Sequence, residues 1–189
     1  MILDKIEKFP IVIFSPPRTG SHALAFHLEN NNPDIRLFLE PGNISNMKEF
    51  WEFSQNNNRY LAKIISFNFV EYPKKVQERL CSIDNFKIKL TRKDIVKQIA
   101  SLYITDSRDI WLYRDHVSSL RFCEPIIIDH ITIDKKIQEI LQDNRYMENI
   151  PFDVEVFYED IASFKSKTTS TPKPANYDEL LSEISNRLR

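Results

Sequence analysis

The chain alternates short apolar runs with segments in which apolar residues recur every three or four positions. Runs of the first kind are typical of strands, and the longer period is typical of amphipathic helices. We predict strands at residues 11–14, 34–39, 60–67, 86–90 and 152–158. The predicted helices follow residue 20 and cover residues 46–55, 73–81, 95–103 and 131–144, with a last helix from residue 176. This alternation predicts an α/β fold of three layers, with a mostly parallel sheet of about five strands flanked by helices.

The chain reads as one domain spanning residues 1–189, because no repeat, linker or change of composition divides it. Its 42% hydrophobic content is sufficient for a core. A net charge of −1 argues against a nucleic-acid partner. The chain shows no signal peptide and no apolar run long enough to span a membrane. Cys81 and Cys123 match no metal or redox spacing, so we expect a reduced, cytoplasmic protein.

The first apolar run leads into a loop, residues 16–22 (PPRTGSH), that opens a helix. Free N–H groups, the helix dipole and the charge of Arg18 would all favour a phosphate there. Gly20 is one of only two glycines, so we expect its backbone to need a conformation that other residues avoid. A Walker loop requires the pattern G-x-x-x-x-G-K-S/T, whereas here Ser21 stands in place of the lysine.

The pattern P-P-R-T-G-S resembles the 5′-phosphosulfate loop of sulfotransferases that use PAPS (3′-phosphoadenosine-5′-phosphosulfate). The resemblance implies that this loop binds the 5′-phosphosulfate through Pro17, Arg18, Thr19, Gly20, Ser21 and His22. It also implies that Arg18 stabilises the charge that develops on the bridging oxygen. His22 departs from the pattern, because many members of the family have a second threonine or serine there.

Glu40 follows the second predicted strand and precedes Pro41 and Gly42, which end it. The carboxyl edge of a parallel sheet is where α/β proteins bind ligands. The segment L-F-L-E-P resembles the L-F-E-P segment of carbohydrate and bacterial sulfotransferases, in several of which the glutamate is the catalytic base. The resemblance implies that role for Glu40. The alternative is an exposed carboxylate in a turn, in which case His22 and His116 are the next candidate bases.

A second motif follows the fourth predicted strand, with the pattern L-T-R-K-D-x-V-x-Q-x-x-S-L-Y. It resembles the 3′-phosphate motif of bacterial PAPS sulfotransferases, which implies that Arg92 and Ser101 bind the 3′-phosphate. The planar guanidinium of arginine suits that group. Lys93 has the spacing to Ser101 that the cytosolic branch uses, so it is a second candidate. The alternative is a charge pair of Arg92 and Asp94 at a helix start.

Three further features bear on a site. Lys63 lies inside the third predicted strand; it could point to the site, but an edge strand is the simpler explanation. Residues 106–122 are rich in Arg, Trp, Tyr and His; they would build the acceptor pocket in this family, or equally pack as a helix on the sheet. The segment Y-E-D-I at 158–161 resembles a signature of the family, and we expect it to cap the next helix.

Taken in order, these patches resemble PAPS-dependent sulfotransferases of the bacterial and carbohydrate branch, whose fold is similar to that of P-loop NTPases. The resemblance implies transfer of a sulfuryl group from PAPS to a hydroxyl of a small molecule or carbohydrate. PAP is then the product, and no metal is expected. Two alternatives remain: a P-loop-type kinase using ATP, and a catalytically degenerate nucleotide-binding protein.

Overall fold

The computed structural model describes residues 6–42, 44–108, 124–161, 164 and 173–189. Its sheet has the strands β1 (Ile11–Ser15), β2 (Arg36–Leu39), β3 (Tyr60–Ile65), β4 (Phe86–Thr91) and β5 (Val154–Phe157). The order is β2-β3-β1-β4-β5, and every pairing is parallel. The predicted α/β class with a parallel sheet of about five strands is therefore confirmed.

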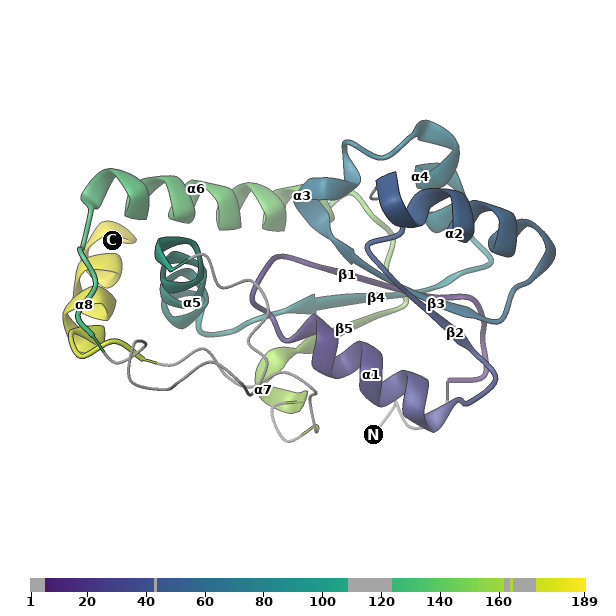
Figure 1. The fold of residues 1–189 in the computed structure, drawn as a ribbon, viewed down its shortest axis with the longest axis horizontal. Coiled ribbons are helices and arrows are strands. Elements are labelled where there is room, and N and C mark those ends of the chain that lie inside the picture. Colours follow the sequence, from purple (N-terminus) through teal and green to yellow (C-terminus); the bar gives the residue numbers. More distant parts are fainter. Residues whose placement is uncertain (1–5, 43, 109–123, 162–163, 165–172) are drawn as a thin grey trace.

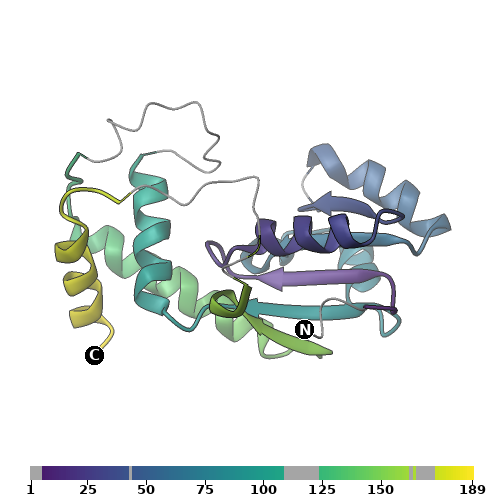
Figure 2. The ribbon, with the colours of Figure 1, turned by 90° about the horizontal axis from the view of Figure 1, so that it is seen from below.

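Helices cover both faces of the sheet and extend beyond one of its ends (Figure 1). They are α1 (Ser21–Asn31), α2 (Ile44–Asn56), α3 (Ser66–Phe69), α4 (Lys74–Leu80), α5 (Ile95–Ser107), α6 (His130–Met147), α7 (Tyr158–Ile161) and α8 (Tyr177–Arg187). Helix α1 lies on one face, and α2 and α4 lie on the other. Figure 2 shows α5 and α8 grouped beyond the carboxyl ends of the strands.

The central strand β1 separates two hydrophobic cores. Ile11 and Ile13 pack in one core with Leu24 of α1, and Val12 and Phe14 pack in the other. Successive side chains of a strand point to opposite faces of the sheet, so an uninterrupted apolar run contributes to both cores. A third core joins α5, α6 and α8. This third core holds α5 against the end of the sheet where a ligand would bind.

Two predicted strands end earlier than expected, because a short helix begins at the carboxyl end of each. Strand β3 ends at Ile65 and α3 follows at once, while β5 ends at Phe157 and α7 follows. Short apolar runs do not distinguish helix from strand. The edge position expected for Lys63 is wrong, because β3 lies between β2 and β1.

Asp143 on α6 is a buried carboxyl group that makes stability depend on pH. The residue is 2% exposed, and its Oδ2 has no hydrogen-bond partner. Burial and the charge of Glu139 raise its pKa to about 7, and the nearby Ser66 hydroxyl opposes the rise. Because the folded-state pKa exceeds the unfolded one, this group's contribution is present at low pH and is lost as the pH rises through about 7.

Replacing Asp143 by asparagine should therefore stabilise the protein above neutral pH. We expect equal stabilities at about pH 3, below the unfolded pKa, and at about pH 8.5 a free energy of unfolding that is higher for the variant by up to roughly 4 kcal/mol. Thermal unfolding across this range measures it. The exposed Asp84→Asn variant is the control and should follow the wild type. A stability difference that does not change with pH would contradict the assignment.

Candidate functional site

The loop after β1 is held by its own side chains and opens directly into α1. The Thr19 hydroxyl, which is fully buried, donates to the Pro16 carbonyl oxygen over 3.0 Å. Gly20 is the N-cap of α1 and supplies no side-chain cap. The first N–H groups of a helix have no partner within it, and the dipole makes this end positive. The loop and the helix start together present a surface that favours an anion.

Gly20 is required here for two reasons. Its φ is 74°, in the left-handed region that favours glycine. A Cβ at this position would also lie 2.6 Å from Cδ2 of Tyr158, which packs against the loop. The expectation that this glycine answers a backbone requirement is confirmed.

Replacing Gly20 by alanine should lower the free energy of unfolding by about 2 kcal/mol or more, from strain at positive φ and the clash with Tyr158. Thermal or urea unfolding measures the loss. Adding Tyr158→Ala to Gly20→Ala removes the clash and leaves the backbone strain. The double variant should therefore lose less free energy of unfolding than the sum of the losses in the two single variants. The control Ala23→Gly, in the first turn of α1, should cost only about 1 kcal/mol. A Gly20→Ala protein as stable as the wild type would contradict this account.

The two motifs predicted to bind phosphates meet in space. Arg18 Nε donates to Ser101 Oγ over 3.0 Å, and Arg92 Nη1 donates to the Arg18 carbonyl over 3.4 Å. Gln98, also on α5, donates from Nε2 to the Pro17 carbonyl over 2.8 Å. Three contacts thus fasten α5 and the turn before it to the loop. Residues more than 70 positions apart in the sequence form one site.

Two guanidinium groups make this site strongly positive. Burial, and then the charge of Arg92, lower the pKa of Arg18 from its ordinary value. Arg92 Nε is buried without a hydrogen-bond partner, and the nearest carboxylate oxygen, from Glu159, is 4.0 Å away. A buried donor of this kind is expected to have a partner. A bound phosphate or sulfate would supply one and would relieve the repulsion between the two arginines.

The Y-E-D-I segment supports Arg92 rather than the helix that follows it. Arg92 lies over the Tyr158 ring, with 4.6 Å between Cζ and the ring centroid. The Glu159 carboxylate accepts hydrogen bonds from the backbone N–H groups of Lys93 and Asp94, over 3.0 and 3.2 Å. The expected capping of the next helix is therefore wrong, because Glu159 caps the turn that leads into the earlier helix α5.

The other charged groups of this turn have partners of their own. Asp94 caps α5 by accepting from the Lys97 N–H, and its carboxylate lies 2.7 Å from Lys97 Nζ. Lys93 Nζ lies 3.3 Å from Asp160 and over the Phe157 ring. The structure thus places Arg92, and not Lys93, against the loop. Asp94 makes its ion pair with Lys97, so the alternative charge pair with Arg92 is not what organises the helix start.

Glu40 follows β2 at the same carboxyl edge and is tied to the neighbouring strand. Its N–H donates to the Lys63 carbonyl over 2.7 Å, and its Oε1 accepts from Lys63 Nζ over 2.8 Å. The Lys63 side chain is 1% exposed and that of Glu40 is 21% exposed. Burial lowers the pKa of Lys63, and Glu40 opposes this shift. Glu40 is therefore a partly buried, paired carboxylate and not an exposed turn residue.

Arg18 and Glu40 share an unusual backbone conformation. Among the described residues they are the two non-glycine residues with positive φ, at 63° and 51°. Such conformations cost on the order of 1–3 kcal/mol each and concentrate at functional sites. The two residues predicted as catalytic from the sequence are thus the two strained ones.

His22 and Tyr72 complete the surroundings of Glu40. Burial and the charge of Lys63 lower the pKa of His22 to about 4, and Glu40 partly offsets this. His22 is therefore neutral at pH 7 and is a weak base. Tyr72 is buried against Gly42, where an added Cβ would lie 2.0 Å from Cδ1 of the tyrosine ring. Burial and the charge of Glu40 raise the pKa of Tyr72.

Sequence reasoning did not assign Lys63, Tyr72 or Tyr158 to the site. A lysine inside an apolar run was a usable signal for Lys63, because a charge in a central strand needs a buried partner. The packing of both tyrosines depends on distant segments and left no local signal. His116, and the predicted acceptor region beyond Arg108, lie outside the described residues.

Two searches of the described residues bear on other kinds of site. No group of three or more His, Cys, Asp or Glu side chains in the described part of the chain is arranged to hold a metal ion. None of the described helices has the length and apolar character needed to cross a membrane.

Comparisons with known proteins assign no family to this chain. The site combines a phosphate-type loop, two arginines and a glutamate–lysine pair at one edge of a parallel sheet. No protein-family model matches this chain, and no curated protein matches it at a significant level.

Proposed function

We propose that this protein is a PAPS-dependent sulfotransferase that moves a sulfuryl group to a hydroxyl of a small molecule or carbohydrate. The observation that carries the proposal is the pair of strained residues, Arg18 and Glu40, at the ends of β1 and β2. One is a cation beside a helix start, and the other is a carboxylate. This is the pair that group transfer from an anionic donor to a hydroxyl requires.

The donor would be held at two places. Backbone N–H groups at the start of α1 would bind the 5′-phosphosulfate. Arg92 and Ser101 would bind the 3′-phosphate, with the buried Nε of Arg92 as one of the donors. Arg18 lies between them, because its guanidinium contacts Ser101 while its carbonyl accepts from Arg92.

In the proposed reaction the acceptor oxygen attacks the sulfur atom, and the bond between sulfur and the phosphate oxygen breaks. PAP leaves with the electron pair of that bond, and Arg18 stabilises the charge on its oxygen. Glu40 takes the proton of the acceptor hydroxyl. Lys63 holds Glu40 in place, since it donates to the carboxylate from a buried position. The neutral His22 can donate a hydrogen bond but is poorly suited as the base.

Calorimetric titration with PAP tests the proposal, with AMP and ATP–Mg²⁺ as comparators. We expect PAP to bind more tightly than AMP, because only PAP carries the 3′-phosphate that Arg92 and Ser101 would hold. Tighter binding of ATP–Mg²⁺ would favour a P-loop-type kinase instead. If none of the three bound, the chain would not be a nucleotide-dependent transferase.

A further inference from the structure

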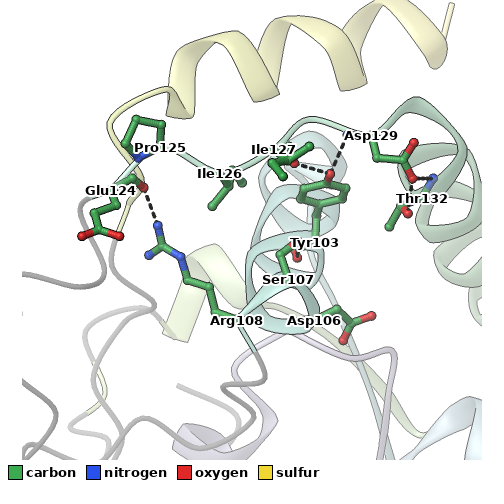
Figure 3. Close-up of a pocket in the computed structure, with 10 residues that line it drawn as sticks. All are labelled: Tyr103, Asp106, Ser107, Arg108, Glu124, Pro125, Ile126, Ile127, Asp129 and Thr132. Atoms are coloured by element: carbon green, nitrogen blue, oxygen red, sulfur yellow. Dashed lines mark hydrogen bonds between the residues drawn. The ribbon is translucent and has the colours of Figure 1, made fainter.

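A cavity of about 550 Å³ lies between the carboxyl end of α5, residues 124–129 and the first turn of α6 (Figure 3). Polar groups of its wall are paired with one another: the Tyr103 hydroxyl donates to the Ile127 carbonyl and accepts from the Asp129 N–H, each over 2.7 Å. The cavity has no lining residue in common with the site at the sheet edge. The geometry of the candidate base Glu40 is therefore set by other groups, which lie at that edge.

The turn that carries Glu40 is held from three sides although its backbone is strained. The Glu40 N–H donates to the Lys63 carbonyl over 2.7 Å, and the Leu39 carbonyl accepts from Asn46 Nδ2 over 3.0 Å. The third contact is a tyrosine ring packed on the glycine two residues after Glu40. A glutamate with a φ of 51° persists only where the surrounding structure enforces this conformation. The contacts of the turn are therefore what maintains it.

The third contact leaves no space between the backbone of Gly42 and the ring of Tyr72. An added Cβ at Gly42 would lie 2.0, 2.1 and 2.2 Å from Cδ1, Cγ and Cδ2 of that ring. Gly42 does not share the positive φ of Gly20. The glycine is thus required at this position by the ring that covers it, and not by backbone freedom.

Tyr72 is itself fixed between α3 and α4, and it is 4% exposed. Its N–H donates to the Phe69 carbonyl over 3.2 Å, and its carbonyl accepts from Gln77 Nε2 over 2.8 Å. The rings of Tyr72 and Phe69 meet edge to face, with 5.7 Å between their centroids. A closely packed side chain transmits displacement instead of absorbing it. The ring therefore provides a rigid support for the Glu40 turn.

The hydroxyl of Tyr72 adds no hydrogen bond to this support. Its oxygen is buried and has no hydrogen-bond partner. A buried polar group without a partner lowers stability. The part of Tyr72 that can act on the turn is therefore the ring.

The other strained residue, Arg18, is held in the same way. It precedes Gly20 by two positions, and the Tyr158 ring packs on that glycine. We propose that Tyr72 is a positioning residue for Glu40, whose ring keeps the strained turn in place and with it the carboxylate. The inference rests on the proposed function, because Glu40 is the base in that reaction.

Replacing Tyr72 by leucine removes the ring and should lower turnover by about 10- to 100-fold, because a small displacement of a catalytic group has an effect of this size. Both kcat and kcat/KM should fall, since a base acts only in the transition state, while PAP affinity stays unchanged. Tyr72→Phe keeps the ring, so it should retain wild-type turnover and melt no lower than the wild type. Equal losses of turnover in the two variants would overturn the inference.

A double variant tests whether the contact with Gly42 carries the effect. Gly42→Ala should lower turnover as Tyr72→Leu does, because the new Cβ would displace the ring. Since both changes act through one contact, the double variant should lose little more turnover than either single variant. Losses that multiply would overturn the inference.

Phe152→Leu is the matched control. The Phe152 ring packs in the same core, with its centroid 5.7 Å from that of Phe14. Its removal should lower the melting temperature, as Tyr72→Leu does, but should leave turnover unchanged. If Phe152→Leu lowered turnover as strongly as Tyr72→Leu, the effect would be one of core stability and the positioning role would be wrong.

NMR tests the inference without any turnover. At positive φ the amide proton lies closer to the Hα of its own residue, so Glu40 should give a strong intraresidue NOE in the wild type and in Tyr72→Phe. This NOE should weaken in Tyr72→Leu, and an unchanged one would overturn the inference. A wild type that neither binds PAP nor transfers a sulfuryl group would contradict the proposed function, and the NOE would still decide whether Tyr72 holds the turn.

Discussion

Replacing Arg92 by alanine should weaken PAP binding by about 10- to 100-fold while changing AMP binding by no more than about threefold. A charge-assisted hydrogen bond contributes roughly 1.5–3 kcal/mol, which corresponds to this range. Arg92 is fixed by the Tyr158 ring and the Arg18 carbonyl, and its Nε is buried without a partner. The loss should therefore fall on the ligand that carries a 3′-phosphate. Calorimetric titration of both nucleotides measures the selectivity.

Two variants separate a phosphate contact from a general loss of positive charge. Arg92→Lys keeps the charge but loses the planar fork, so it should recover only part of the affinity for PAP. Lys93→Ala removes the neighbouring cation, whose ammonium group pairs with Asp160, and should leave PAP binding nearly unchanged. Equal loss of PAP and AMP binding in Arg92→Ala would show that Arg92 only supports the loop. A large effect of Lys93→Ala would transfer the role to Lys93.

Replacing Glu40 by glutamine should lower turnover by about 10²- to 10⁴-fold, the contribution typical of a general base. Glutamine keeps an oxygen that can accept from Lys63, so we expect PAP affinity to change little. The assay follows radiolabelled sulfuryl transfer from PAPS to a panel of sugars and phenols, using an acceptor that the wild type modifies. Glu71→Gln, an exposed carboxylate, is the control. A Glu40→Gln enzyme with wild-type turnover would exclude Glu40 as the base.

The buried partner of Glu40 provides an independent check on folding. Removing one member of a buried ion pair leaves the other charge uncompensated, which lowers the free energy of unfolding by roughly 3–5 kcal/mol. Removing both members costs much less. Glu40→Gln should therefore lower the melting temperature, and adding Lys63→Met should restore part of it. Turnover should stay low in the double variant. Recovery of stability without recovery of activity would separate the chemical role of Glu40 from its structural one.

Much of the fold was predictable from local pattern. The apolar run at residues 11–14 indicated a strand buried on both faces, and β1 is the central strand. The scarcity of glycine marked Gly20, whose φ is positive. These features follow from backbone sterics and from which face of a strand or helix is apolar, and both are properties of neighbouring residues. Where the local signal was ambiguous, as at the ends of β3 and β5, the boundaries were wrong.

The sequence by itself determined the alternation of strands and helices, the turn at Gly20 and the positions of Arg18, Glu40 and Arg92 at strand ends. Only the tertiary structure decided that Lys63 lies in an inner strand and forms an ion pair with Glu40. It also decided that Tyr158 packs between Gly20 and Arg92, more than 60 residues away. Strand order and side-chain packing are set by contacts between distant segments. A charge or ring therefore finds its partner only when the whole sheet has assembled.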